Sequence, residues 1–303
     1  MSGVISTGNH PAALWPGVKA WFGRTYDEHQ EEYSQIFTMS SSSKKYEEVV
    51  EVTGFGLAPE KDEGSGTAYD SETQGDTSRL THVAYSLGFI VTREERDDNQ
   101  YEVVANRRSK ALAFSMRQTK ENVGANILNR AFDSNYTGPD GVELISTAHV
   151  TKDGTQSNHL TVAADISETA IEDMNIQIMQ ARNSRGLKIS LMPDCLIVPP
   201  QLWYKANRIL KSTLQSGTAN NDLNVLKATN AFPGGIKVNH YLTDPDAWFI
   251  KTNVPEGLVH YQRVAVEFTQ DNDFDTENAK AKAYERYIFG WNDFRGLYAS
   301  PGA

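Results

Sequence analysis

Residues 46–132 constrain the fold of this chain more than any other part, because they join a long polar loop to a very long helical pattern. Two β-rich segments, 46–52 and 80–91, enclose a stretch dominated by glycine, serine and acidic residues. We interpret the two segments as the stems of a hairpin whose loop offers turn residues but almost no core-forming side chains. Such a loop cannot bury itself within its own subunit, so the sequence predicts an arm that lies on neighbours. A mobile linker is the alternative.

A long helical pattern follows the arm. Thr92 and Glu95 form a capping box at its start, and a kink is expected near Asp98 and Asn99. At 1.5 Å per residue, residues 101–132 would span about 48 Å, so we expect a spine as long as the subunit is wide. Apolar residues recur along one helical face: Leu112, Met116, Val123, Ile127, Leu128, Ala131 and Phe132. Charged residues are expected on the solvent side: Arg107, Lys110, Arg117, Lys120 and Glu121.

The charge and the composition exclude several classes of protein. With 29 Lys and Arg against 39 Asp and Glu, the net charge is -10, which argues against a protein that reads nucleic acid by neutralising phosphates. Nine acidic residues against three lysines give residues 44–78 a net charge of -6. The mean hydropathy of -0.51 predicts no membrane span, and the start of the sequence does not resemble a signal peptide. Cys195, the single cysteine, lies in an apolar run and is predicted to be a buried thiol.

The second half of the chain indicates an α+β arrangement of short elements. Asp165 with Glu168 is predicted to open a helix that runs to about Asn183. Residues 187–198 are typical of a buried central strand, which Pro199 and the following proline end. The other expected elements are a turn at 136–141, a strand at 142–145, a turn at 153–154, a helix at 201–213, a loop at 217–222, and strands at 236–239, 248–252 and 264–268.

No constellation in the sequence has the spacing of a catalytic or metal site. Asp271 to Asp275 alternates oxygen ligands as a calcium loop does, but Thr276 stands where that loop needs glycine and Lys282 where it needs a carboxylate. We therefore expect a solvated acidic turn there. The histidines include no pair with the spacing of a metal site on a helix.

Two further motifs also lack the context that chemistry needs. Gly54 and Gly56 are not followed by the third glycine and the helix start of a dinucleotide loop. Ser146 lies near His149, yet no nucleophile elbow surrounds it, so we interpret His149 as a hydrogen-bonding residue in a structural turn. The sequence predicts no catalytic residue, no cofactor and no metal.

The order of these parts resembles the major capsid proteins of tailed bacteriophages, with the Hong Kong 97-type shell fold, over nearly all 303 residues. The local motifs are similar to those of Mu-like major head subunits. These motifs are Gly138-Pro139-Asp140-Gly141 leading to Ser146-Thr147-Ala148-His149, Val198-Pro199-Pro200 before a helix with Arg208-Ile209-Leu210, Leu242 to Phe249, and Gly290 to Gly302.

The resemblance implies an α+β fold with five parts. They are an N-terminal arm (1–45), an extended hairpin loop or E-loop (46–91), a spine helix with a peripheral domain (92–186), an axial domain (187–263) and a return to the peripheral domain (264–303). It further implies a non-enzymatic subunit whose hexamers and pentamers tile an icosahedral shell around double-stranded DNA. Implied partners are further copies of the chain, a scaffold, a portal and a decoration protein, and the implied location is the virion, after assembly in the bacterial cytoplasm.

Three other classes stay open at this stage. An encapsulin-like nanocompartment shell shares the fold but encloses cargo enzymes, and a tail or baseplate protein is also structural. A hydrolytic or metal-dependent enzyme is favoured only by scattered carboxylates.

The resemblance also directs attention to contact residues. Aromatic side chains crowd the N-terminal segment and are common interface anchors, although a short helix packed on its own domain is the alternative. The predicted inter-subunit contacts are Trp15, Trp21, Phe22, Tyr26, Phe37, Gly54, Phe55, Tyr69 and Arg79. A chain without residues 1–37 is expected to stay soluble but to fail to close shells. Arg107, Arg108 and Lys110 are candidates for contact with the DNA backbone at the inner surface, although a merely solvated face is slightly favoured.

Overall fold

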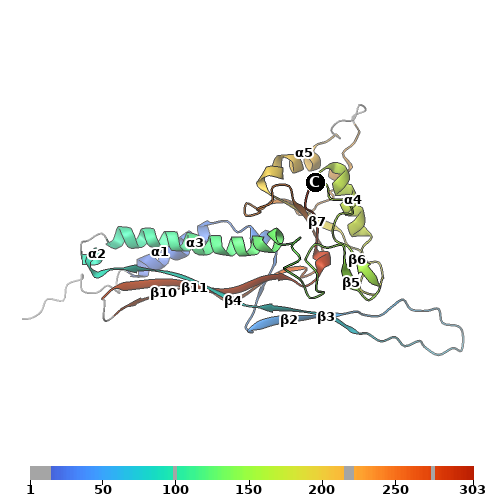
Figure 1. The fold of residues 1–303 in the computed structure, drawn as a ribbon, viewed down its shortest axis with the longest axis horizontal. Helices are drawn as coiled ribbons and strands as arrows, with labels where there is room; N and C mark the ends of the chain where they lie inside the picture. Colours follow the sequence, from blue (N-terminus) through green and yellow to red (C-terminus); the bar gives the residue numbers. More distant parts are fainter. Residues whose placement is uncertain (1–14, 98–100, 215–221, 274–276) are drawn as a thin grey trace, which may run out of the picture.

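The structure has an elongated half and a compact half, with a hairpin that projects from their junction (Figure 1). It is a computed structural model that describes residues 15–97, 101–214, 222–273 and 277–303. In the elongated half a long sheet lies against two roughly parallel helices. The compact half sits over one end of this sheet, and the hairpin extends beyond it.

Four strands in the order β1-β10-β11-β4 form the long sheet of the elongated half. The first pair is parallel and the other two pairs are antiparallel. One face is buried beneath helices α1 and α3, while the other face is open. The bounds are β1 (Thr38–Ser41), β4 (Val83–Val91), β10 (Leu258–Asn272), β11 (Ala279–Trp291), α1 (Trp15–Glu28) and α3 (Tyr101–Asn129).

The spine begins as the sequence predicts. The Glu95 amide donates to Thr92 Oγ1 at 3.3 Å, so Thr92 caps helix α2 (Arg93–Asp97). The expected kink near Asp98 and Asn99 lies outside the described residues. Helix α3 has 29 residues, which corresponds to about 44 Å. Its predicted apolar stripe is buried or packed against the core, with Leu112, Met116, Leu128 and Ala131 fully buried.

The prediction that the charged residues of α3 face solvent is wrong for three of them. Arg117, Lys120 and Glu121 are buried, because partners on the N-terminal segment and on the sheet satisfy their charges.

The compact half contains a second four-stranded sheet in the order β12-β9-β7-β8. Helix α4 packs against it and starts at Glu168, capped not by Asp165 but by Ser167, whose hydroxyl accepts from the Ala170 amide at 3.1 Å. Cys195, on the central strand, is buried as predicted. The bounds are α4 (Glu168–Met179), β7 (Pro193–Val198), η4 (Pro200–Leu202), α5 (Trp203–Lys211), α6 (Val225–Ala228), β8 (Gly235–Val238), β9 (Trp248–Thr252), β12 (Leu297–Ser300), and a small hairpin β5 (His149–Thr151) and β6 (Gly154–Gln156).

The compact half draws on residues outside the range 187–263, and the expected axial domain over that range stays a prediction. Its core cluster runs from Leu160 to Tyr298 and includes the apolar face of α4, which only the sheet of this half can bury. Strand β10 already leaves for the long sheet at Leu258. Strand β12 pairs with β9, so the chain ends in the compact half instead of the elongated one.

The projecting hairpin also differs from its expected pairing. Strand β2 (Tyr46–Val52) pairs with β3 (Gln74–Thr81), whereas most of the expected return strand is β4 and belongs to the long sheet. The polar residues of β3 are held by cross-strand contacts. Arg79 lies 3.6 Å from Glu48 and 4.0 Å from the ring centre of Tyr46.

One hydrophobic cluster joins the two halves. It packs Tyr33 and Phe37 of the N-terminal segment with Phe289 of the long sheet and with Ile197 and Phe249 of the compact sheet. A continuous core of this kind resists rotation of one half against the other. In the described part of the chain, no helix is long and apolar enough to cross a membrane.

Candidate assembly surfaces

The loop between β2 and β3 is the most exposed part of the structure. Every residue from 55 to 74 is exposed. Three large side chains of this loop are strongly exposed to solvent: Phe55 is 60% exposed, Leu57 is 82% exposed and Tyr69 is 94% exposed. Clustered apolar exposure of this degree marks an interaction site, because the free subunit offers nothing to cover it.

Beyond its root at Leu80, the hairpin is held to its own subunit by polar contacts. The Ser184 hydroxyl donates to Glu51, and Arg295 lies 4.0 Å from the same carboxylate. Farther out, Arg185 pairs with Asp70 at 3.2 Å, and Asp70 accepts the Gly56 amide at 2.8 Å. The carboxylates of Glu51 and Asp70 are largely exposed, so we expect these contacts to contribute little to stability and to orient the hairpin without burying it.

A groove lies between the root of the hairpin and the spine. It holds about 510 Å³ and is lined by apolar side chains from four elements, among them Leu80, Tyr85, Val123 and Ile127. At its rim, the guanidinium of Arg130 lies 4.4 Å from the ring centre of Tyr136. The groove therefore combines an apolar floor with a cationic edge.

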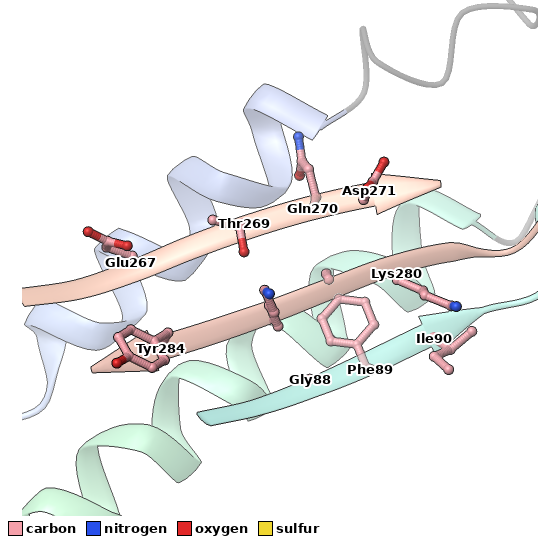
Figure 2. A pocket seen from close by; sticks show the side chains of 11 residues that line it. Gly88, Phe89, Ile90, Glu267, Thr269, Gln270, Asp271, Lys280 and Tyr284 are labelled. Carbon is pink, nitrogen blue, oxygen red and sulfur yellow. The ribbon is translucent and has the colours of Figure 1, made fainter. Parts of the chain in front are cut away.

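The open face of the long sheet carries a shallow hollow of about 720 Å³ (Figure 2). Lys280 and Lys282 of β11 are exposed and line this hollow, and Glu267 and Asp271 of β10 line it on one side. On β4, position 88 needs glycine, because a Cβ there would lie 2.6 Å from the carbonyl oxygen of Ala281 on the neighbouring strand. The hollow therefore carries acidic side chains on β10 next to basic side chains on β11.

The aromatic residues of the N-terminal segment have a different role from the one expected. Phe22, Tyr26 and Phe37 are buried in the subunit's own core, which matches the alternative of a helix packed on its own domain. Side chains this deeply covered cannot offer area to a neighbour. Trp15 and Trp21 belong to α1, but their side chains lie outside the described part of the structure.

The spine residues expected to contact DNA fall into two groups. Arg107 and Lys110 are exposed. Arg108 instead forms a bidentate pair with Glu95, at 2.8 and 3.1 Å, and donates to the carbonyl of Ile90. Its charge is therefore partly neutralised within the subunit.

A buried polar network, which sequence reasoning placed on the surface, ties the N-terminal segment to the spine. Lys120 Nζ lies 3.3 Å from Glu285 and donates to Gln262 at 2.6 Å, while the Tyr26 hydroxyl donates to the other Glu285 oxygen at 2.6 Å. Burial lowers the pKa of Lys120, and the carboxylate of Glu285 counteracts this effect.

The same network holds the backbone that follows α1. Arg117 pairs with Glu31 and donates to the carbonyl of Tyr26 at 2.9 Å. The carboxylate of Glu121 accepts the amides of Glu32 at 3.0 Å and of Tyr33 at 3.1 Å, and burial raises its pKa to about 7. A signal for this network existed in the sequence, since Arg117, Lys120 and Glu121 adjoin the apolar stripe of α3.

The motifs that suggested chemistry have structural roles. His149 lies 2.5 Å from Asp140 and 3.0 Å from Asn158, and it stacks on Phe294 with ring centres 3.9 Å apart, as expected for a structural turn. Burial raises the pKa of Cys195 to about 11. Within the described ranges, no group of three His, Cys, Asp or Glu residues could hold a metal ion. The last two residues of the Asp271–Asp275 motif lie outside those ranges.

Comparison with known families decides what this architecture is. The family described as phage capsid protein matches residues 75–300, which include the spine and most of both halves. This chain belongs to the phage capsid protein family. The capsid subunit has no match among curated proteins.

Solved structures agree on the fold of the capsid subunit. A structure from Microbacterium phage Oxtober96 has a TM-score of 0.55 at 8% identity, covering 91% of this chain and 92% of that one. One from Mycobacterium phage Patience has a TM-score of 0.54 at 10% identity, with coverage of 99% and 89%. A virus-like particle from Pyrococcus furiosus gives 0.53 at 12% identity, with coverage of 93% and 97%. Identities this low establish the fold alone.

The subunit therefore has the α+β Hong Kong 97-type capsid fold, as its sequence predicted. The name extended loop is used from here on for the projecting hairpin of β2 and β3 together with the loop that joins them. Its place is in the capsid of the virion. Gly54, Phe55, Tyr69 and Arg79 all lie in the extended loop, and their inter-subunit contacts stay a prediction.

Proposed function

We propose that this chain is the major capsid subunit of a tailed phage, related to Mu-like head proteins, and that its hexamers and pentamers build an icosahedral shell around double-stranded DNA. The observation that carries the proposal is the set of exposed large side chains in the extended loop, Phe55, Leu57 and Tyr69, on a subunit of the phage capsid family. Side chains exposed in this way gain their contacts only from another copy.

The groove at the hairpin root supports ring closure. The 21 residues between Val52 and Gln74 extend away from the subunit, so the tip lies far from its own groove. Phe55 and Leu57 offer apolar side chains to the floor of a neighbour's groove, and the acidic residues of the loop complement Arg130 at its rim. Repeated head to tail, this contact generates closed rings.

Replacing the tip side chains tests the proposal. The triple variant Phe55→Ser, Leu57→Ser, Tyr69→Ser is expected to abolish shells while the melting temperature of the unassembled subunit stays within about 2 °C, because exposed side chains add little to its stability. Electron microscopy and sedimentation would measure assembly, and thermal unfolding would measure stability.

A matched control removes apolar residues elsewhere. Val150→Ser, Val162→Ser and Ile176→Ser affect exposed side chains of the compact half and its flanking hairpin, and this variant should retain a larger share of assembly. Normal shells from the tip variant would remove the extended loop from the proposal.

The inner surface of the shell is proposed to contact DNA through Arg107 and Lys110, with a smaller contribution from Arg108 because Glu95 holds it. Contacts of this kind reach the phosphate backbone and weaken in salt. The variant Arg107→Glu with Lys110→Glu is expected to lower the DNA density next to the inner wall in electron cryomicroscopy. Unchanged density at that wall would assign these side chains to a solvated face.

Scaffold, portal and decoration proteins are further proposed partners, and assembly is proposed to occur in the host cytoplasm. The hollow on the open sheet face is a candidate surface for a decoration protein, because its paired charge rows suit a polar partner.

A nanocompartment shell is the second candidate, favoured by the fold shared with the virus-like particle from Pyrococcus furiosus. The nucleic-acid content of purified particles separates the two functions. Nuclease-resistant double-stranded DNA of uniform length supports a phage capsid, and an enclosed enzyme without DNA supports a compartment.

A further inference from the structure

His260 occupies an unusual position in the core. It is 0% exposed, and neither of its ring nitrogens has a hydrogen-bond partner in the described part of the chain. Aromatic rings surround it, with ring-centre distances of 4.4 Å to Phe289, 5.6 Å to Tyr33 and 5.8 Å to Tyr287. An imidazolium formed at this site would have no acceptor.

The charges around His260 also disfavour its protonation. Lys120 Nζ lies 5.1 Å from the ring centre of Tyr287 and 5.3 Å from that of Tyr33, so it shares the aromatic surroundings of His260. Burial, followed by the charges of Lys120 and His82, lowers the pKa of His260 to about 3.

His82 is the second buried imidazole of this region. Its Nε2 lies 3.1 Å from the Ser42 hydroxyl, while its Nδ1 has no partner in the described structure. Burial lowers its pKa; Arg263 and Arg286 act in the same direction, and Glu47 opposes them.

Both histidines adjoin the same short strand, His260 through backbone pairing and His82 through the hydroxyl of Ser42. Strand β1 pairs with β10 so that Met39 is opposite His260, and Ser42 directly follows β1. β1 has only four residues and pairs on one side, whereas β10 and β11 pair along 12 positions. Of the strands next to His260, β1 is the one most easily detached.

We propose that His260 and His82 form an acid-sensitive release for strand β1. In the docked state both rings stay neutral. When β1 and the Tyr33 side chain move away, water reaches the rings, which can then take up protons. The inference concerns the single subunit and stands whether or not the proposed shell function holds.

The direction of the pH dependence follows from the depressed pKa. Below the ordinary histidine pKa of about 6.5, the ring of His260 binds a proton in the detached state but not in the docked state. His260 alone therefore raises the equilibrium constant for detachment of β1 about tenfold for each pH unit below that value. The effect continues to a pH of about 3, where the docked ring itself becomes protonated.

Nearby carboxylates modify the total response. The pKa of Glu31 is lowered by its bonds with Tyr33 and Arg117, against the effect of burial, so it adds to opening only at lower pH. Glu121, with its pKa raised to about 7, favours docking as the pH falls toward 4.5. Glu285 faces the cluster through Lys120 and Tyr26. Because these groups remain in a His260 variant, comparison with that variant isolates the histidine.

Hydrogen exchange of the unassembled full-length chain tests the proposal. Wild type and His260→Phe are compared from pH 4.5 to 7.5, with exchange of the Thr38–Ser41 amides corrected for its intrinsic pH dependence. The ratio of the wild-type to the variant opening constant is expected to rise about 50-fold between pH 6.5 and 4.5, because the detached ring is already half protonated at pH 6.5. Amides of β7 should show no such change. His240→Gln, an exposed histidine paired with Glu32 at 2.6 Å, should keep the wild-type response.

A ratio that stays constant with pH would overturn the proposal. If His260→Phe does not fold, histidine resonances of the wild type give a second measurement. A His260 ring that stays neutral in the docked state down to pH 4.5 supports the release, and a titration midpoint near 6.5 contradicts it.

Discussion

A chain without residues 1–37 will fail to fold. The deletion removes five large side chains from two core clusters: Phe22, Tyr26, Tyr33, Ile36 and Phe37. Burying a side chain of this size contributes about 1.5–3 kcal/mol, whereas a whole domain is stable by only about 5–15 kcal/mol. This prediction, made from the structure, replaces the expectation from sequence that the truncated chain would stay soluble and fail only in assembly.

Circular dichroism and solubility after expression measure the effect. Deletion of residues 1–14 is the control, since it leaves helix α1 and these core residues in place, and this chain should unfold cooperatively like the wild type. A soluble, cooperatively folding 38–303 fragment would show that the N-terminal segment is dispensable for the core.

Lys120→Met will lower the free energy of unfolding by about 3–5 kcal/mol, the effect of removing one partner from a buried ion pair. Methionine fills a similar volume, so the main loss is electrostatic. Glu285 keeps the Tyr26 hydroxyl as donor but loses its cation in a site that water does not reach. Denaturant unfolding of the unassembled subunit provides the measurement.

Arg107→Met on the exposed face of the same helix is the matched control and should change stability by no more than about 0.5 kcal/mol. Adding Glu285→Gln to Lys120→Met should restore part of the loss, because it removes the uncompensated charge. Equal stability of Lys120→Met and wild type would mean that water or a rearranged side chain already neutralises Glu285.

The sequence was sufficient to predict the order of the parts. Thr92 caps the start of the spine, the apolar stripe of α3 faces the core, and the loop after Val52 is exposed, because each depends on local patterns or on composition. The phage capsid fold followed from this order together with motifs spread over the chain.

The central strand of the long sheet escaped sequence analysis. Strand β11 alternates Ala279, Ala281 and Ala283 with lysines, and both residue types are depleted in strands. Alanine suits this face because α1 and α3 lie close above it. Period-two alternation was the available signal, but the residue types concealed it.

The roles of charged and aromatic residues were harder to predict than the fold. Arg117, Lys120 and Glu121 look like solvent-facing residues until their partners Glu31, Glu285 and the backbone after α1 are known. Those partners lie more than 80 residues away in sequence. Phe22 and Tyr26 likewise look like interface anchors because the sequence does not show which surface covers them.

The cluster that joins Tyr33 and Phe37 to Ile197 and Phe249 has a consequence for lattice geometry. Five-fold and six-fold rings bring subunits together at different dihedral angles. Because one hydrophobic cluster joins the two halves of the subunit, the halves cannot rotate against each other to follow these angles. The extended loop is fastened by a few polar contacts, such as Arg185 with Asp70, and can swing. In the proposed shell, we expect the loop to adjust to local curvature while the body moves as one unit.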